Sequence, residues 1–501
     1  MTTVTITDAP LAIEDLLAVV DGARVELDGG TRARIAASRE VVDRALIAGD
    51  AVYGLTTQVG HGKDTRLTEE QIRREQHFLV MSHSGGIGPP LPTAIVRAAL
   101  AVRLNGIARG GSGAGVAVAE TLAALLNAGV HPVVPETASV GAADIGQMAG
   151  MAQVAIGEGR AEYRGELLPG GEALRRAGIA PLVLGGKDGL ALISSNGVSI
   201  GQAALVVARA DRTAEAADMA VAVSMEATGA NTSVLQPVVG LAKPIPGQVA
   251  AAGHLRELLA GSPLLEPGAA RSVQDALSFR VVPQVHGALR EYVAAARSAV
   301  TVELNAAADN PLVSLADQAL VSNGNFQPVV MAIACDALRI AVAQVGQLSE
   351  RRLSHLWDAF FQQLAGGGPP PTPLYGMQLR YPAAALFSEL RQLAGPATLD
   401  TPPLDFGVED HGTSAPLSVR KTGTALGRLE DLLAIELLLA RDVLAGAPAR
   451  PVLGAGTGAA LGTVEEAIAA ADPYADAVHR ALRDRFPGRQ AAGHRAAPPE
   501  R

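Results

Sequence analysis

Residues Val285–Leu304 read VHGALREYVAAARSAVTVEL, and this stretch decides the fold. Its apolar positions are spaced four, four, three, four and four residues apart, which lays one stripe along a helix: Val285, Leu289, Val293, Ala296, Val300 and Leu304. Similar periodicity occupies residues 92–127, 201–224, 326–353, 383–394 and 415–446. As a group these segments exceed the usual length of helices in globular proteins, which favours a bundle with contacts between subunits.

Strand-like alternation is rare and short. It occurs at Val4–Ile6 and at Leu182–Leu184, so an α/β sheet is not expected. The sequence therefore predicts an all-α fold, a long helical bundle with a smaller N-terminal region of loops and helices. We expect a single domain over residues 1–487, with the N-terminal region at about 1–200 and the bundle at about 201–487. Residues 488–501 are expected to form a disordered tail. Gly366–Pro371 cannot be helical and is expected to form a mobile or covering loop that connects two helices.

Composition narrows the class of protein. Of 501 residues 48% are hydrophobic but only 3% aromatic, so Ala, Leu and Val dominate, which favours closely packed helices. The net charge of −9, without a basic block, argues against a nucleic acid partner. The single Cys335 excludes an internal disulfide. We find no secretory signal and no uncharged apolar run that would span a membrane, since Leu432–Leu439 contains Glu436; the cytoplasm is the expected location.

Two common kinds of site are not indicated. The ten histidines include no pair three or four residues apart, so a helical metal-ligand pair is not expected. The glycine-rich run Arg109–Gly115 follows a helical pattern and lacks the lysine of a phosphate loop, so it predicts a break between helices.

Four segments place polar residues within apolar, glycine-punctuated sequence: Tyr53–Gly60, Ser82–Gly88, Ser278–Gln284 and Val408–His411. Each has a simple explanation when taken singly. Tyr53 would be a loop tyrosine with a hydrogen-bonded hydroxyl, and His83 a satisfied core histidine. Arg280 would pair with a carboxylate, and Glu409 and Asp410 would cap a helix.

Together, and in this order, the four segments resemble the aromatic amino acid ammonia-lyase family, which includes histidine and phenylalanine ammonia-lyases. The resemblance runs from about residue 12 to 450, at near-family spacing. Its further matches are Asn105 with Arg109 and Ser112, Ser139–Ala142, Ile156–Gly159, Lys187–Leu192, Gln274–Asp275, Asp309–Val313, Gly324–Phe326, Leu348–Arg352 and Glu409–His411. It implies an all-α fold and a homotetramer whose active sites take residues from several subunits, with a small-molecule amino acid or betaine as substrate.

One departure from the family pattern concerns its prosthetic group. The family reads Ser-Val-Gly-Ala-Ser-Gly-Asp-Leu, and its Ala-Ser-Gly cyclises to an electrophilic methylidene-imidazolone. Here the chain reads Ser139-Val140-Gly141-Ala142-Ala143-Asp144, one residue shorter and without that serine. The group cannot form by the family route, so no cofactor is expected. In addition, Leu277 replaces a family tyrosine, Arg380 replaces a usual glutamine, and the family Asn-Gly is displaced to Asn196-Gly197.

The resemblance also implies roles for particular residues. Tyr53 matches the base that removes the β-proton, and Arg280 the residue that grips the substrate carboxylate. His83 aligns with the residue that meets the side chain in histidine ammonia-lyases, and Asn196 with a substrate-binding asparagine. We expect Glu409 to be a catalytic residue and to lie, with Arg380, at the heteroaromatic end of the substrate. An ion pair on a helix surface explains Arg380 equally well. Phe326 or Tyr381 would face a substrate cation.

A substrate with its own good leaving group suits a site without the electrophile. A quaternary trimethylammonium departs as neutral trimethylamine, so the expected reaction is β-elimination from ergothioneine to give thiourocanate, without the prosthetic group. Alternatives are a lyase acting on hercynine or on another leaving group, an ordinary ammonia-lyase with an unrecognised electrophile, and an inactive homologue acting as a binding partner. The fumarase–aspartase group would require a Gly-Ser-Ser loop, which the sequence lacks.

Overall fold

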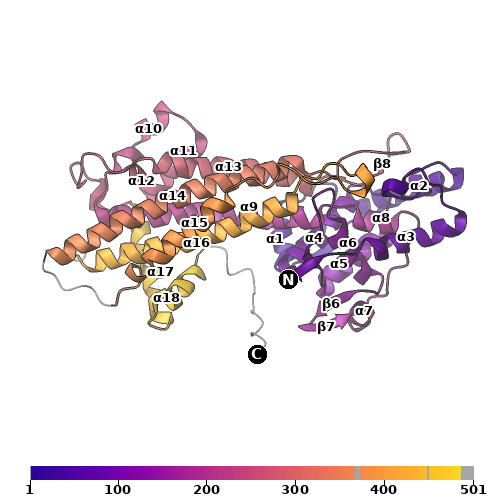
Figure 1. Ribbon diagram of the computed structural model, residues 1–501, viewed down its shortest axis with the longest axis horizontal. Helices are drawn as coiled ribbons and strands as arrows, with labels where there is room; N and C mark the ends of the chain where they lie inside the picture. The colour runs from indigo at the N-terminus through magenta and orange to yellow at the C-terminus, as the bar shows by residue number, and fades with distance from the viewer. Residues whose placement is uncertain (1, 367–372, 448–450, 487–501) are drawn as a thin grey trace. The chain divides into compact units, whose positions relative to one another are not determined.

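The computed structural model describes residues 2–366, 373–447 and 451–486, and in this part of the chain helices predominate (Figure 1). The chain divides into two compact units, each assembled from separate segments. The first unit comprises Met1–Val206, Arg297–Ile333 and Pro396–Arg420. The second unit comprises Val207–Ala296, Ala334–Gly395 and Lys421–Arg501. The loop expected at Gly366–Pro371 and the expected C-terminal tail fall almost wholly outside the described residues.

The first unit combines shorter helices with small sheets. Its helices are α1 (Ile13–Val20), α2 (Gly29–Ala48), η1 (Gly60–Gly62), α3 (Glu69–His83), α4 (Thr93–Ala108), α5 (Val116–Ala128), α6 (Ile145–Ala155), α7 (Gly170–Ala177), α8 (Asp188–Ile193) and η5 (Asp405–Gly407). Its strands are β1 (Thr3–Ile6), β2 (Arg24–Leu27), β3 (Ile87–Pro90), β4 (Val130–Pro132), β5 (Pro135–Thr137), β6 (Arg160–Tyr163), β7 (Glu166–Pro169), β8 (Leu312–Ser314) and β9 (Ala319–Val321). β1 pairs in parallel with β2, whereas β3–β5, β4–β6–β7 and β8–β9 are antiparallel.

The second unit is almost entirely helical. Its shorter helices are η2 (Thr232–Leu235), α10 (Pro237–Ala242), α11 (Pro246–Leu258), η3 (Pro263–Leu265), α12 (Leu277–Arg280), η4 (Met377–Leu379), α15 (Arg380–Leu393), α17 (Ala455–Ala470) and α18 (Ala475–Arg483). Four long helices contribute residues to both units: α9 (Gly197–Thr228), α13 (Val282–Leu304), α14 (Val329–Ala365) and α16 (Ala415–Ala445). The expectation of an all-α protein with long bundle helices is confirmed.

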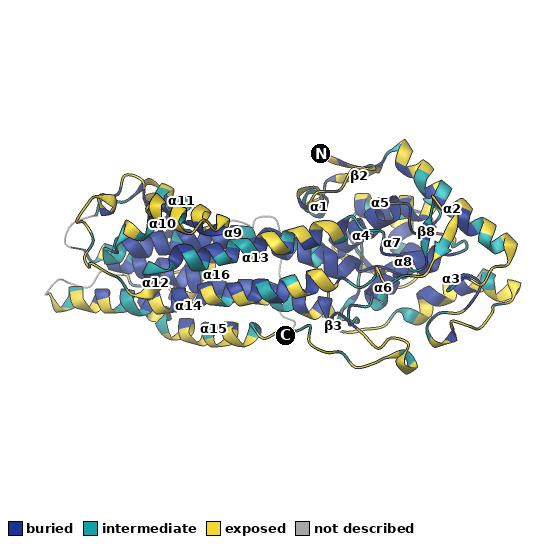
Figure 2. Cartoon of the chain, turned by 90° about the horizontal axis from the view of Figure 1, so that it is seen from above, coloured by how far each residue is buried: buried dark blue, intermediate teal, exposed yellow. Residues whose placement is uncertain are grey.

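The apolar stripe that predicted the bundle forms part of the core. Leu289, Val293, Ala296, Val300 and Leu304 on α13 are all buried. Figure 2 shows the same dark, buried side on α9, α14 and α16, whereas α10 has no buried residue. Since the stripe follows the helical period, burial of these side chains orients the long helices toward a common core.

The carboxylate of Glu436, in the core of the second unit, is fully hydrogen-bonded. Arg352 donates to both carboxylate oxygens of Glu436 at 2.6 and 3.0 Å, and both side chains are inaccessible to solvent. The hydroxyls of Ser224 and Ser349 complete the coordination of that carboxylate. Burying such charges is tolerable because each lone pair meets a donor.

Two sequence predictions about local structure have different outcomes. The break expected at Arg109–Gly115 is confirmed, because α4 ends at Ala108 and α5 begins at Val116. The strand-like reading of Leu182–Leu184 is wrong: this segment pairs with no strand, and only the Leu182 N–H is bonded, to the Ala155 carbonyl. Pro181 on one side and two glycines on the other leave the segment extended but unpaired.

Two helical segments are long and apolar enough to cross a membrane, by length and composition alone. They are Asp188–Thr228 and Val329–Ala365, in which 89% and 56% of the most apolar window is buried inside the protein. Burial accounts for the apolar character of the first segment, which is a core helix of the bundle.

Candidate active site

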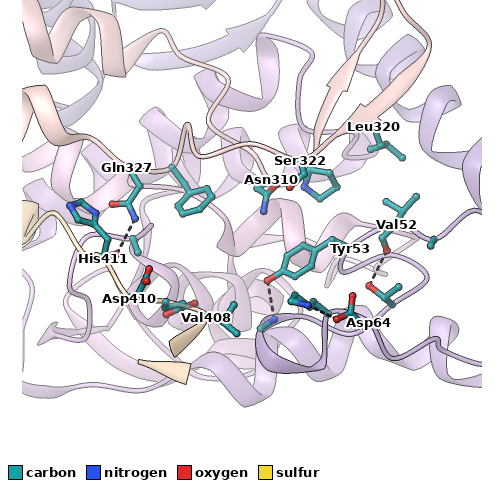
Figure 3. A pocket seen from close by; sticks show the side chains of 18 of the residues that line it. Val52, Tyr53, Asp64, Asn310, Leu320, Ser322, Gln327, Val408, Asp410 and His411 are labelled. Carbon is teal, nitrogen blue, oxygen red and sulfur yellow. Dashed lines mark hydrogen bonds and ion pairs between the residues drawn. The ribbon is translucent and has the colours of Figure 1, made fainter. Parts of the chain in front are cut away.

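A cavity of about 630 Å³ in the first unit brings several of the predicted site residues together (Figure 3). Tyr53, Phe326 and Glu409 line it, and so does Ala142, from the turn where the family carries its prosthetic group. The other lining residues used below are Gly60, Lys63, Arg66, Gln327, Asp410 and His411. Segments about 350 residues apart in the sequence thus form one site.

Tyr53 is held by a compact turn. The Val52 carbonyl accepts the N–H groups of residues 55, 56 and 57, which curls the chain around Gly54. Gly54 has φ +63°, and a Cβ there would lie 2.6 Å from Leu190, so only glycine fits. The Gly60 N–H donates to the Tyr53 hydroxyl oxygen at 3.0 Å. The prediction that Tyr53 has a hydrogen-bonded hydroxyl is confirmed, and the bond leaves its O–H proton free to act elsewhere.

The electrostatics of Tyr53 oppose its ionisation in the empty cavity. Burial raises the pKa of Tyr53 above its ordinary value, and the negative charges of Glu409 and Asp405 raise it further. The Gly60 N–H acts in the opposite direction, because it stabilises the phenolate. A positive charge placed in the cavity would lower this pKa and make the phenolate accessible.

Glu409 stands at an acidic end of the cavity. Its backbone forms a short bridge with Leu404, at 2.7 and 3.2 Å, and no helix follows until Ala415. The reading of Glu409 and Asp410 as helix caps is therefore wrong. Burial, with the nearby charge of Asp405, raises the pKa of Glu409, while His83 lowers it. Within the described residues neither Glu409 nor Asp410 has an ion pair.

The turn at residues 139–144 presents one methyl group, that of Ala142, to the cavity. Gly141 and Ala143 have φ of +90° and +57°, and the Ala143 N–H donates to the Phe326 carbonyl at 3.1 Å. The Ser139 hydroxyl donates to the Ala143 carbonyl at 2.8 Å and accepts from the Gly141 N–H at 2.9 Å. Ser139 is thus tied across the turn, as an internal brace. Neither Ala142 nor Ala143 offers a hydroxyl that dehydration would remove.

Asp144 anchors this turn from within the protein. Its carboxylate accepts the Ser199 N–H and hydroxyl at 2.7 and 2.9 Å, and its own N–H donates to the Ser195 carbonyl at 2.8 Å. Burial raises its pKa to about 6 despite these bonds. Asn196 lies behind the same turn, 3.5 Å from the Gly141 carbonyl, and is almost fully buried. Its Oδ1 has no hydrogen-bond partner in the part of the chain that the structure describes, and the residue does not line the cavity.

His83, at the C-terminal end of α3, does not line the cavity either. Its Nδ1 is 2.9 Å from the Leu79 carbonyl, which can only accept, so that nitrogen carries the proton. The imidazole nevertheless lies near enough to Glu409 to lower the pKa of that carboxyl. The reading of His83 as a hydrogen-bonded histidine fits these contacts, although its side chain is only half-buried.

Three predicted substrate contacts belong to the second unit and do not line this cavity. Arg280, at the end of α12, has no ion pair within the described residues, contrary to its simple explanation. Arg380 donates to Glu350 Oε1 and to the Ser354 hydroxyl, both at 2.8 Å, so the ion-pair explanation holds for it. Tyr381 is 80% exposed and contacts Trp357 edge-on.

The sequence reasoning missed several residues of the site. Gln327 donates to the His411 carbonyl at 3.1 Å, and its buried Oε1 has no partner. Asp405 binds the turn that follows Tyr53. The sequence offered only weak signals for them. Gln327 directly follows Phe326, and Asp405 lies four positions before Glu409. Among the described residues no group of three His, Cys, Asp or Glu side chains is arranged to hold a metal ion.

Comparison with known proteins agrees with this geometry. The family model for aromatic amino acid lyases matches residues 11–466. Histidine ammonia-lyase of Gloeobacter violaceus is 38% identical over 95% of this chain and 92% of its own length. That of Anaeromyxobacter sp. strain K is 39% identical over 90% and 92%.

Solved structures extend the likeness to the whole fold. Ergothionase from Treponema denticola, an ergothioneine-degrading enzyme, superposes with a TM-score of 0.90 at 26% identity, covering 98% of this chain and 100% of that one. Histidine ammonia-lyase from Trypanosoma cruzi gives 0.86 at 30% identity, covering 98% and 94%. The chain belongs to the aromatic amino acid lyase family and is a carbon–nitrogen lyase.

Proposed function

We propose that the chain removes trimethylamine from ergothioneine, the trimethylated betaine of 2-thiohistidine, to give thiourocanate without a methylidene-imidazolone. One observation carries the proposal. The turn that would hold the electrophile carries only methyl side chains at this point: Ala142 lines the cavity beside Tyr53, and Ala143 lines a neighbouring pocket together with Ala142 and Glu409. The residues present do not fit the prosthetic group, because no hydroxyl stands where dehydration would create its exocyclic carbon.

The chemistry of the leaving group explains why such a site still has a function. An ordinary amino group is a poor leaving group, and the family's electrophile activates it through a covalent bond. A trimethylammonium group needs no such activation, since it is permanently cationic and departs as a neutral amine. A substrate of this kind therefore supplies what the turn lacks.

The charges that line the cavity suit a permanent cation. Lys63 pairs with Asp64, whereas Arg66 donates to the neutral Gly49 carbonyl at 2.8 Å and keeps its positive charge. Glu409 and Asp410 have no ion pair among the described residues, so the two carboxylates outweigh Arg66 and the balance of charge along the cavity is negative. The ring of Phe326 offers the trimethylammonium a cation–π contact.

In the proposed step the Tyr53 phenolate takes the β-proton. The electron pair of that C–H bond becomes the second bond between the α and β carbons, and the C–N bond breaks toward trimethylamine. The substrate cation lowers the pKa that burial and two carboxylates raise, so binding itself prepares the base. The proton then leaves Tyr53 for solvent, and the product is a conjugated acid.

The substrate carboxylate needs a cationic partner of its own. We propose that Arg280 supplies it from another subunit of a homotetramer, because it has no ion pair within the described part of its own chain. Apolar side chains exposed on the long helices support association: Val302 on α13, and Val330, Ile333 and Ile340 on α14. Arg380, Tyr381, His83 and Asn196 remain proposed contacts of the assembled site.

A second candidate is deamination of histidine, which the names of the 38–39% identical relatives favour. It requires an electrophile from another source. An inactive homologue is disfavoured because an idle site has no reason to keep Tyr53, Arg280 and Glu409 together.

The test is a substrate panel. Purified protein is incubated with ergothioneine, hercynine and histidine, and absorbance of the conjugated product is followed together with released trimethylamine and ammonia. We expect turnover of ergothioneine with equal amounts of trimethylamine and thiourocanate, and turnover about 10²- to 10⁴-fold slower with Tyr53→Phe. Turnover of histidine alone would overturn the proposal, and turnover of none would favour a binding role.

A further inference from the structure

Asp405 makes a two-point contact with the turn that follows Tyr53. Its Oδ2 accepts the backbone N–H of His61 at 2.7 Å, and its Oδ1 lies 2.9 Å from the His61 Nδ1. The His61 ring also meets Phe406 edge-on, with centroids 5.0 Å apart. One carboxylate thus holds both the backbone and the side chain of His61.

Gly60 transmits this contact to Tyr53. A Cβ at Gly60 would lie 2.2 Å from Asp405 Oδ2, and its φ is +59°, so the approach is possible only for glycine. The same residue donates its N–H to the Tyr53 hydroxyl oxygen at 3.0 Å. Figure 3 shows the Tyr53 hydroxyl directed at this turn. Tyr53, Gly60, His61 and Asp405 therefore form one continuous chain of contacts.

The segment around Asp405 also carries Glu409. Asp405, Phe406 and Gly407 have φ of +46°, +53° and +83°, a conformation that L residues seldom adopt in succession. Two hydrogen bonds between the backbones of Leu404 and Glu409 close this tight turn. The tight turn therefore fixes the distance between the Asp405 carboxylate and Glu409.

We propose that Asp405 is a positioning residue that sets the Tyr53 oxygen against Glu409 by clamping the Gly60–His61 turn. The inference rests on the proposed function in taking Tyr53 as the base. It adds that the base is aligned by a carboxylate which touches neither the substrate nor Tyr53 directly. A displacement of about 1 Å in a base can cost about 10²-fold in rate, so a clamp at this point has a large kinetic effect.

The contact contributes little to overall stability. The His61 side chain is 66% exposed and the Asp405 side chain 25%, so the pair is solvated and screened. Loss of the clamp should therefore alter the turn and the rate and leave the melting temperature almost unchanged. That difference separates a positioning role from a general structural one.

The experiment uses the intact protein and four variants. Asp405→Ala removes the clamp and the charge, whereas Asp405→Asn removes the charge but keeps an acceptor for the His61 N–H. His61→Ala removes the ring and keeps the backbone contact. Asp400→Ala is the matched control, because this exposed aspartate on the same segment has no hydrogen bond or ion pair among the described residues.

Two readouts are taken for each variant. Hydrogen exchange of the peptide covering residues 54–62 should be about 10-fold or more faster in Asp405→Ala than in the parent, and near the parent rate in Asp405→Asn and in the control. With ergothioneine, kcat should fall about 10- to 100-fold in Asp405→Ala, while KM stays within about twofold of the parent value. The kcat of His61→Ala should lie between those of the parent and of Asp405→Ala.

Both Asp405 variants should shift the pH profile to the same lower pH, since both remove a charge that raises the pKa of Tyr53 and of Glu409. Of the two Asp405 variants, only Asp405→Ala should show the fall in kcat. Unchanged exchange in Asp405→Ala would overturn the clamp whatever the substrate is. Faster exchange in Asp405→Ala than in the parent, combined with a parent protein that leaves ergothioneine untouched, would uphold the clamp and reject the proposed function.

Discussion

The carboxylates of the two units differ in what surrounds them. In the second unit Glu436 is inaccessible to solvent and receives Arg352 twice and two serine hydroxyls. In the first unit Glu409 lines a cavity and has no ion pair among the described residues. Glu436 can therefore hold its charge without a ligand. Glu409 has no such partners, so a bound cation would stabilise its charged form.

In a protein rich in buried charge, chemistry depends on the ionisable groups that no other side chain neutralises. Buried pairs such as Arg352–Glu436 satisfy each other and are inert. Groups whose ionisation the protein opposes, such as Tyr53 and Glu409, are the ones that a bound cation can activate.

The largest effect is expected from Tyr53→Phe. Removing the hydroxyl removes the base, so kcat on ergothioneine should fall about 10²- to 10⁴-fold with KM little changed. The measurement is steady-state release of trimethylamine, with the melting temperature as a control for folding. Activity within a few fold of the parent would show that another group removes the proton.

Breaking the buried pair should affect stability instead. Glu436→Ala leaves Arg352 buried without its partner, which should cost about 3–5 kcal/mol in the free energy of unfolding. Glu389→Ala, which breaks the more exposed contact with Arg428, is the matched control and should cost about 0–1 kcal/mol. Urea unfolding measures both. Equal costs for the two variants would contradict the expectation that a buried ion pair matters more for stability than an exposed one.

The pH profile tests the charge of Glu409. Its pKa is raised, so kcat/KM should decline as pH falls through a value above 4.5 and the carboxylate that faces the cation is neutralised. Toward alkaline pH the rate should keep rising, because burial raises the pKa of Tyr53 above its ordinary value. Glu409→Gln should lose the acid limb, shift the alkaline rise to lower pH and cost about 10- to 100-fold in kcat/KM. An unchanged acid limb would assign that limb to another group.

The smallest effect concerns Glu303 on α13, also in the first unit. Burial raises its pKa to about 7, above its ordinary 4.5. A raised carboxyl pKa means that its contribution to stability is complete below pH 4.5 and is lost as pH rises through 7. Glu303→Gln should therefore raise the melting temperature by about 1 °C or more at pH 8.5, with no gain at pH 4. A gain of the same size at both values would contradict an ionisation effect.

Much of the fold follows from sequence periodicity. The stripe from Leu289 to Leu304 is buried as its spacing requires, and the break at Arg109–Gly115 falls between α4 and α5. Leu182–Leu184 shows the limit: alternation over three residues does not specify a strand when no neighbour pairs with it. The short strands β3 to β9 have too few residues for a period to appear.

The site was only partly predictable, for a related reason. Tyr53, Phe326 and Glu409 were found through ordered motifs, and the structure brings all three to one cavity. Asp405 and Gln327 were missed because their roles depend on loops that meet only in the folded chain. Arg280 does not line this cavity, and its proposed contribution from another subunit depends on an assembly that a single chain's periodicity does not encode.

The mass of the turn peptide tests the central claim most directly. Protein that turns over ergothioneine is digested, and the peptide containing Ser139–Gly146 is weighed by mass spectrometry. The account predicts the mass of the unmodified sequence, with Ala142, Ala143 and Asp144 intact in an active enzyme. A peptide lighter by two waters would show that a cyclised electrophile forms there, and would contradict it.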